Sequence, residues 1–244
     1  MREHKVLLVT GASSELGRNL IRRISCNYDV IWAHCNQNIE ALDELKSEIG
    51  DKLVPVKADF SSEKETRIMI EKIVKAEDWP DNIVHLSSPK AEYKQFHKYQ
   101  WERYEQEINV SFRSITMILE GLLPQMCQNH YGKIVFVLTS LLTVTPPKYQ
   151  SPYICVKYAL LGLMKNIASE YAARGIFVNG VSPNMIETKF LSNIPGIVVE
   201  QSALNNPIER NITIDEVLSI IEYLLSEGSG CLTGQNISIT GGIV

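Results

Sequence analysis

The feature that most constrains the fold of this chain is a regular alternation between short apolar, β-branched segments and longer helix-like segments. Seven short segments recur, at 5–10, 29–34, 52–57, 82–86, 133–139, 176–181 and 236–240. Helix candidates lie between them, at about 15–26, 38–50, 62–77, 99–129, 150–173 and 213–226. Alternating strands and helices form right-handed βαβ units, which build a parallel sheet with helices on both faces. The pattern therefore predicts a three-layer, doubly wound α/β fold with a seven-stranded parallel sheet.

Composition and length favour one globular domain over residues 1–244. Hydrophobic residues make up 45% of the chain and charged residues 21%, and no Pro-, Gly- or Ser-rich linker divides it. Single α/β domains of this length are ordinary. The formal net charge of −4 leaves no basic footprint, so we expect no nucleic-acid partner.

The first residues and the cysteines bear on location and on metal binding. The chain opens with charged residues, and the apolar run that follows ends at Gly11. That run is too short for a signal-peptide core or a membrane span. Five cysteines, an odd number without any CxxC pair, predict neither a disulfide framework nor a zinc site. We therefore expect a cytoplasmic protein with reduced thiols, without a bound metal and without membrane contact.

Residues 184–212 form the long connection that breaks the alternation. The segment looks irregular, contains Pro195 and Pro207, and separates the sixth strand from the next helix. A long connection at the carboxyl edge of a parallel sheet is typical of a substrate lid, and a disordered loop is the alternative. We interpret it as a lid.

A small-residue turn stands where the first strand passes into the first helix. Residues 10–17 read TGASSELG, with glycines at Gly11 and Gly17. Small side chains let backbone N–H groups approach a phosphate, and the helix N-terminus adds partial positive charge. A generic strand-to-helix turn is the alternative, but the position after a strand and before a helix favours nucleotide binding.

Tyr153 and Lys157 are the candidate reacting pair. They are four residues apart, which places both side chains on one face of the helix predicted at 150–173. The pair follows the fifth strand, whose end carries Ser140 thirteen residues before Tyr153, while Asn109 lies in the preceding helix. Each of these residues alone has an ordinary structural interpretation. Their order and spacing taken together indicate a catalytic site.

The turn and this constellation resemble those of the short-chain dehydrogenase/reductase family, and the resemblance extends along essentially the whole chain. It carries the family's TGxxxGxG turn at 10–17, its Asn, Ser, Tyr and Lys, and its Pro-Gly-x-x-x-Thr segment as Pro-Asn-x-x-x-Thr at 183–188. The resemblance implies a Rossmann fold, an NAD(P) cofactor, and interconversion of a ketone and a secondary alcohol.

The family's catalytic roles map onto four residues. The resemblance implies that Tyr153 donates the proton, Lys157 holds the nicotinamide ribose, Ser140 binds the substrate oxygen, and Asn109 seats a water that relays protons. A tyrosine with its ordinary pKa near 10 exchanges protons slowly at neutral pH. A nearby lysine ammonium favours the phenolate, so we expect Lys157 to lower the pKa of Tyr153.

The cofactor contacts are expected along the whole carboxyl edge of the sheet. The residues are Gly11, Ser13, Ser14, Leu16, Gly17, Asn36, Asp59, Phe60, Tyr153, Lys157, Pro183, Ile186 and Thr188. No acidic residue follows the second strand before Glu40, so nothing there repels a 2′-phosphate. No Arg or Lys stands at Ser14 or Asn36 to attract one. We expect NADP(H) to be favoured over NAD(H).

Two departures from the family pattern concern the cofactor. Glu15 replaces the middle glycine of the turn, where its charge either repels the cofactor phosphates or points away from them. His85-Leu86-Ser87-Ser88 replaces a common Asn-Asn-Ala-Gly turn after the fourth strand. We interpret His85 as a structural residue and not as a catalytic base.

The substrate and the assembly are inferred from the resemblance alone. The chain is most similar in pattern to 3-oxoacyl-[acyl-carrier-protein] reductases, including Arg174 of their carrier-contacting segment, but no arginine stands at 129–131. A 3-oxoacyl thioester is the leading substrate, and a small ketone or a sugar-derived ketone is the alternative. A nucleotide-binding pseudoenzyme is the hypothesis from another class. The resemblance implies a homotetramer built on the closing strand and the two long helices, or else a dimer.

Overall fold

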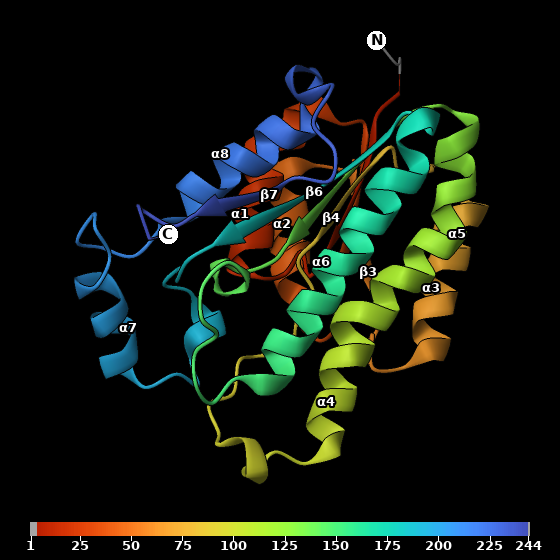
Figure 1. Cartoon of the computed structure of the whole chain (residues 1–244). Helices are drawn as coiled ribbons and strands as arrows, with labels where there is room; N and C mark the ends of the chain where they lie inside the picture. Colours follow the sequence, from red (N-terminus) through yellow and green to blue (C-terminus); the bar gives the residue numbers. More distant parts are fainter. Residues whose placement is uncertain (1–3, 244) are drawn as a thin grey trace.

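A parallel sheet forms the middle layer of the protein (Figure 1). Residues 4–243, the part of the chain that this computed structural model describes, contain seven parallel strands in the order β3-β2-β1-β4-β5-β6-β7. The strands are β1 (Val6–Thr10), β2 (Val30–Cys35), β3 (Leu53–Lys57), β4 (Asn82–His85), β5 (Gly132–Val137), β6 (Ile176–Pro183) and β7 (Asn236–Ile239). The predicted seven-stranded parallel sheet is confirmed.

Helices cover both faces of this sheet (Figure 1). One face carries α1 (Glu15–Ile24), α2 (Glu40–Ile49) and α8 (Ile214–Leu225). The other carries α3 (Glu63–Lys75), α5 (Ser114–Gln128) and α6 (Ser151–Tyr171), and α4 (Trp101–Glu107) packs against α6. The predicted three-layer, doubly wound arrangement is therefore confirmed as well.

Strand β1 shows why this sequence needs two helical layers. Successive side chains of a strand point to opposite faces of the sheet. Val6 and Leu8 enter the core beneath α3, α5 and α6, while Leu7 and Val9 enter the core beneath α1, α2 and α8. All four are buried. A continuous apolar run is stable only when both faces of the strand are covered.

The long helix predicted at 99–129 is interrupted. Helix α4 ends at Glu107, a wide π turn covers Ile108–Arg113, and α5 begins at Ser114, whose N–H donates to the carbonyl oxygen of Asn109. The Nε2 atom of His85 lies 2.8 Å from the carbonyl oxygen of Ser111, inside this turn. A side chain that occupies a helix carbonyl is a known cause of such interruptions, and the sequence carries no Gly or Pro that would mark it.

The segment predicted as irregular at 184–212 contains a helix, so that expectation was wrong in part. Helix α7 spans Gly196–Leu204, with Pro195 at its N-cap position. Proline is compatible with a helix start because the first N–H groups have no partner within the helix. An isolated parallel bridge between Ile186 and Ile212 holds the two ends of the segment together.

The chain order places a crevice at the carboxyl edge of the sheet. Strand β1 lies between β2 and β4. The connection after β1 leads to β2 on one side, and the connection after β3 leads back to β4 on the other side. Ligands of doubly wound proteins bind at this switch point. Within residues 4–243, every helix is too short or too polar to cross a lipid bilayer.

Candidate functional site

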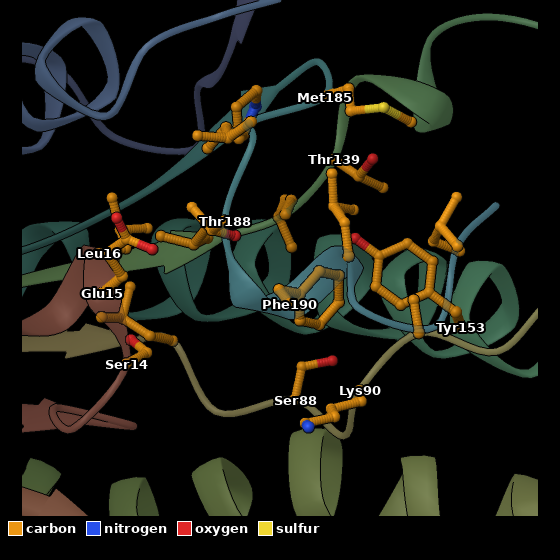
Figure 2. A pocket seen from close by; sticks show the side chains of 18 of the residues that line it. Ser14, Glu15, Leu16, Ser88, Lys90, Thr139, Tyr153, Met185, Thr188 and Phe190 are labelled. Atoms are coloured by element: carbon orange, nitrogen blue, oxygen red, sulfur yellow. The ribbon is translucent and has the colours of Figure 1, made fainter. Parts of the chain in front are cut away.

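A cavity of about 420 Å³ lies at this carboxyl edge. Its walls come from the start of α1, the loops after β2 and β4, the end of β5, the start of α6 and the segment after β6. Figure 2 shows Ser14, Glu15 and Leu16 at one end of the cavity and Tyr153 at the other, with Phe190 between them. The phosphate-binding turn and the candidate reacting residues therefore share one cavity.

The small-residue turn is shaped by its two glycines. Gly11 has a φ of +68°, and a Cβ atom added there would lie 3.2 Å from the backbone nitrogen of Ser87. A Cβ atom added at Gly17 would lie 2.8 Å from the Cα atom of Ala12, a contact that real side chains do not make. Ser14 caps α1 by accepting a hydrogen bond from the Gly17 N–H. The turn thus brings a helix N-terminus against the cavity, which suits an anionic group.

His34 supports this turn from behind. Its Nδ1 atom accepts a hydrogen bond of 3.1 Å from the Gly11 N–H, and its Nε2 atom lies 3.0 Å from the carbonyl oxygen of Ala58. The carbonyl oxygen only accepts, so Nε2 carries the proton and the ring is neutral. Burial lowers the pKa of His34 to about 4. The ring stacks on Phe60 at 3.8 Å, so Phe60 is buried behind the turn and does not line the cavity.

His85 joins three elements of the scaffold. Its Nδ1 atom accepts a hydrogen bond of 2.8 Å from the Thr10 hydroxyl at the end of β1, and its Nε2–H donates to the Ser111 carbonyl oxygen in the π turn. Burial lowers the pKa of His85 to about 3. Both ring nitrogens are used by the protein, which is the geometry of a structural residue and not of a base that faces a substrate.

Tyr153 and Lys157 both line the cavity from α6. The Nζ atom of Lys157 lies 5.4 Å from the centre of the Tyr153 ring and donates a hydrogen bond of 2.7 Å to the carbonyl oxygen of Val137. Burial lowers the pKa of Lys157 to about 8, against the opposing charge of Glu107.

The pKa of Tyr153 differs from the expectation. Burial raises it above its usual range, and the interaction with the Thr139 side chain opposes this increase only in part. The charge of Glu107 raises it further. The sequence predicted a lowered pKa through Lys157, but desolvation of the phenolate is the larger effect in the protein without a bound cofactor.

Two neighbouring hydroxyls at the end of β5 face different surroundings. Thr139 lines the cavity near Tyr153. Ser140 is buried at the start of a short 3₁₀ turn, and its Oγ atom lies 3.5 Å from the Oδ1 atom of Asn184. Asn184 lines the cavity and Ser140 does not. Asn109, the other expected relay residue, lies in the π turn and also outside the cavity lining.

The remaining residues expected from the sequence divide into two groups. Those that line the cavity are Ser13, Ser14, Leu16, Pro183, Ile186 and Thr188. Those outside the lining are Gly11 and Gly17, which shape the turn, the exposed Asn36, and Asp59. Asp59 accepts hydrogen bonds from the N–H and the hydroxyl of Ser61, which is the local turn geometry that precedes α3.

Several cavity residues were not identified as site residues from the sequence, among them Arg18, Ser88, Lys90 and Phe190. Arg18 lies one helical turn after Ser14, a spacing that could have suggested it. The Ser88 hydroxyl is buried without a hydrogen-bond partner among the described residues. The Phe190 ring centre lies 6.1 Å from that of Tyr153, and Lys90 contributes a charged side chain. Ser88 lies in the turn at 85–88 that departs from the family pattern, whereas no sequence signal marks Phe190 or Lys90, because their position depends on how the loops fold back.

Known proteins are similar to this chain over nearly its whole length. The family model described as enoyl-(acyl carrier protein) reductase matches residues 21–244. The 3-oxoacyl-[acyl-carrier-protein] reductase FabG of Thermotoga maritima is 27% identical over 244 residues, covering 99% of this chain and 98% of the relative. Nodulation protein G of Rhizobium sp. (strain N33) is 26% identical over 238 residues, covering 97% and 95%.

Solved structures agree with the fold. The 3-ketoacyl-(acyl-carrier-protein) reductase from Brucella melitensis, complexed with NADH, superimposes with a TM-score of 0.87 at 21% identity, covering 98% of this chain and 97% of that one. Levodione reductase gives a TM-score of 0.88 at 21% identity, covering 98% and 96%. The family model matches most of this chain and the relatives cover nearly all of it, and the chain resembles 3-oxoacyl-[acyl-carrier-protein] reductases. The chain therefore belongs to the short-chain dehydrogenase/reductase family of NAD(P)-dependent oxidoreductases.

Proposed function

We propose that this protein is an NADPH-dependent ketoreductase whose leading substrate class is a 3-oxoacyl thioester. The observation that carries the proposal is the single cavity that joins the turn at Ser13 and Ser14 to Tyr153 and Lys157. A dinucleotide extends from a phosphate-binding helix N-terminus along the carboxyl ends of the strands, so its reactive end and the proton donor would meet in this cavity.

The residues present fit such a cofactor. The close backbone packing at Gly11 and Gly17 opens the turn to a pyrophosphate, and Ser88 in the cavity wall has a buried hydroxyl without a hydrogen-bond partner among the described residues. Besides the turn, the residues that would hold the cofactor are Asn36, Asp59, Lys157, Pro183, Ile186 and Thr188. When bound, the nicotinamide supplies the hydride.

Tyr153 supplies the proton in this proposal. A carbonyl oxygen that receives a hydride at its carbon gains negative charge and needs protonation as it forms. The raised pKa of Tyr153 keeps its hydroxyl protonated at neutral pH, which is the state that a donor requires. The Lys157 ammonium has three N–H donors and uses one on Val137, so the others remain for the ribose and for stabilising the phenolate.

The substrate oxygen is bound by the hydroxyls at the end of β5. The family resemblance assigns this contact to Ser140, and the exposure of Thr139 to the cavity supports a second hydroxyl beside it. Asn109 seats the relay water behind Lys157, and its place in a π turn supports this role because such turns are frequent at functional sites.

The walls near Tyr153 support an apolar substrate. They are formed largely by Leu141, Met185, Phe190, Leu191 and Ile194. A sugar-derived ketone would leave several hydroxyls without partners against these side chains, which costs free energy for each one. An acyl chain or a small apolar ketone would instead bury apolar surface, and relatives named as 3-oxoacyl-[acyl-carrier-protein] reductases favour the acyl chain.

Segment 184–212 acts as the substrate lid. It supplies Phe190 and Ile194 to the cavity. The bridge between Ile186 and Ile212 connects its two ends, and the residues between them form the lid. A lid of this kind excludes water from the reacting atoms when it closes.

The protein assembles as a homotetramer, with a dimer as the alternative. Trp101 on α4 is 66% exposed, and Tyr158 on α6 and Ile108 in the π turn are also exposed. Large apolar side chains gathered on neighbouring helices are typical of an interface between subunits. Size-exclusion chromatography with light scattering distinguishes the two assemblies.

A nucleotide-binding pseudoenzyme is the second candidate function, and Glu15 in the cavity wall favours it. One experiment separates the two. Purified protein is mixed with a panel of 3-oxoacyl thioesters, small apolar ketones and sugar-derived ketones, and the absorbance of NADPH or NADH is followed. Oxidation of NADPH with a 3-oxoacyl thioester is expected. Binding of NADPH without reduction of any ketone would instead support the pseudoenzyme.

A further inference from the structure

We propose that Arg18 binds the 2′-phosphate of NADPH and thereby sets the cofactor preference of this protein. This proposal rests on the proposed function, since it names a residue that selects the cofactor of the same site. The sequence has no basic residue at positions 14 and 36. Arg18, one helical turn after Ser14 on α1, takes that role.

The position of Arg18 matches the adenosine end of the cavity. The Arg18 N–H donates to the Ser14 carbonyl oxygen at 2.9 Å, so Arg18 stands directly above the phosphate-binding turn. It lines the cavity together with Ser14 and Asn38. Asn38 follows β2, and the end of the second strand is where a dinucleotide places its adenosine ribose. Arg18 is therefore within the region that a 2′-substituent would occupy.

The side chain of Arg18 has unused hydrogen-bonding capacity. Its Nε atom is buried without a hydrogen-bond partner among the described residues. The next two arginines of the same helix are paired: Arg22 with Glu48 and Arg23 with Glu222, each at 2.7 Å. A buried guanidinium N–H without a partner is costly, and turning the side chain toward a phosphate in the cavity would satisfy it.

The charges around this end of the cavity discriminate between the two cofactors. Residues 34–38 contain no carboxylate, so no acidic side chain there accepts a hydrogen bond from the 2′-hydroxyl of NADH or repels a phosphate. Glu15 also lines the cavity, and the positive charge of Arg18 three residues later offsets its negative charge. Arginine binds phosphate through two parallel N–H donors, an interaction that NADH does not offer.

The test compares binding of NADPH, NADH and adenosine 2′,5′-bisphosphate by isothermal titration calorimetry, so that no turnover is needed. Arg18→Ala is expected to weaken NADPH and the bisphosphate by about ten- to a hundredfold, because a hydrogen-bonded charge is lost. NADH is expected to change by less than about threefold, since it lacks the phosphate. Arg18→Lys, which keeps the charge without the planar fork, is expected to lie between.

Arg23→Ala is the matched control, because it removes the same charge from the same helix outside the cavity lining, and its partner is Glu222, whereas Glu48 interacts with both Arg22 and Arg18. It is expected to leave all three affinities unchanged, and thermal melts show that both alanine variants are folded. Equal weakening of NADPH and NADH in Arg18→Ala, or no change for NADPH, would overturn the role of Arg18 while the ketoreductase proposal stands. Failure of the wild type to bind any dinucleotide would overturn the proposed function itself.

Discussion

The Lys157 ammonium donates a hydrogen bond of 2.7 Å to the carbonyl oxygen of Val137, at the last residue of β5. This contact fixes the buried charge at the end of a central strand, with its Nζ atom 5.4 Å from the centre of the Tyr153 ring. The backbone of the sheet thus positions Lys157 beside the proton donor before any cofactor binds. The environment also brings the pKa of Lys157 down to about 8, within the range of ordinary enzyme assays.

The rate of ketone reduction is expected to fall as the pH rises through about 8. Burial lowers the pKa of Lys157, so the ammonium that stabilises the phenolate is lost above that pH. The Tyr153 hydroxyl stays protonated over the same range, because its own pKa is raised. The measurement is kcat/KM against pH from 6 to 10 at saturating NADPH. A profile that stays flat to pH 10 would show that the charge of Lys157 is not required.

Tyr153→Phe is expected to lower turnover by about 10²–10⁴-fold, because it removes the proton donor and keeps the ring. NADPH affinity should change by less than about threefold, since the ribose contact is assigned to Lys157. Tyr158→Phe is the matched control: Tyr158 lies on the same helix, and its hydroxyl donates to the Leu142 carbonyl oxygen at 3.3 Å. Equal activity of wild type and Tyr153→Phe would refute the mechanism.

The two hydroxyls at the end of β5 are distinguished by a pair of substitutions. Thr139 faces the cavity and interacts with Tyr153, whereas Ser140 lies behind it. We expect both Thr139→Val and Ser140→Ala to lower kcat/KM, with the larger loss, about ten- to a hundredfold, for Thr139→Val. A larger loss for Ser140→Ala would mean that the 3₁₀ turn rearranges when substrate binds. KM and kcat measured separately show whether binding or chemistry is affected.

The sequence was sufficient to predict the fold because its apolar runs and its order of strands and helices indicate the same architecture. Apolar runs such as 6–9 require helices on both faces, and the alternation of strands with helices leaves few topologies. The ends of elements were harder. The π turn after Glu107 depends on His85, which reaches the Ser111 carbonyl oxygen from a strand that is distant in sequence. The local sequence at 108–113 does not indicate that contact.

The site could be predicted only where spacing alone fixes geometry. The interval between Tyr153 and Lys157 places both on one helix face whatever surrounds them. The roles of Thr139 and Phe60 depend on which way a side chain turns at the end of an element, and Phe60 turns toward His34 because their rings stack. The missing hydrogen-bond partner of the Arg18 Nε atom among the described residues could not be inferred from the sequence, since Arg22 on the same helix has the same type of side chain and pairs with Glu48.

The protein is expected to lose stability as the pH falls from 7 towards 4.5. Burial lowers the pKa values of His34 and His85 to about 4 and about 3, below the ordinary value of 6.5. The unfolded chain therefore binds more protons in this range, and each histidine makes the free energy of unfolding decrease by about 1.4 kcal/mol per pH unit. Burial raises the pKa of Glu107 to about 7, which gives a slope of opposite sign and offsets about one histidine.

Urea unfolding at pH 5, 6 and 7 measures this dependence. Glu107→Gln removes the opposing slope, so the variant should lose stability more steeply than the wild type on acidification. His34→Gln should give a flatter dependence. An increase in the stability of the wild type between pH 7 and pH 5 would contradict the neutral, buried state of the two histidines.

Glu15→Gly is expected to tighten NADPH binding, because Glu15 lines the cavity beside the phosphate-binding turn. Repulsion between two solvated unit charges at such a site is about 0.5 kcal/mol, so the gain should be about twofold. The same charge stabilises the N-terminus of α1 by about 0.3–1 kcal/mol, so the variant should also melt at a lower temperature.

Glu15→Gln separates the effect of the charge from the backbone effect of glycine. Glu40→Gln, in the first turn of α2 and outside the cavity lining, is the control. Unchanged or weaker affinity in both Glu15 variants would mean that the carboxylate turns away from the phosphates when the cofactor binds.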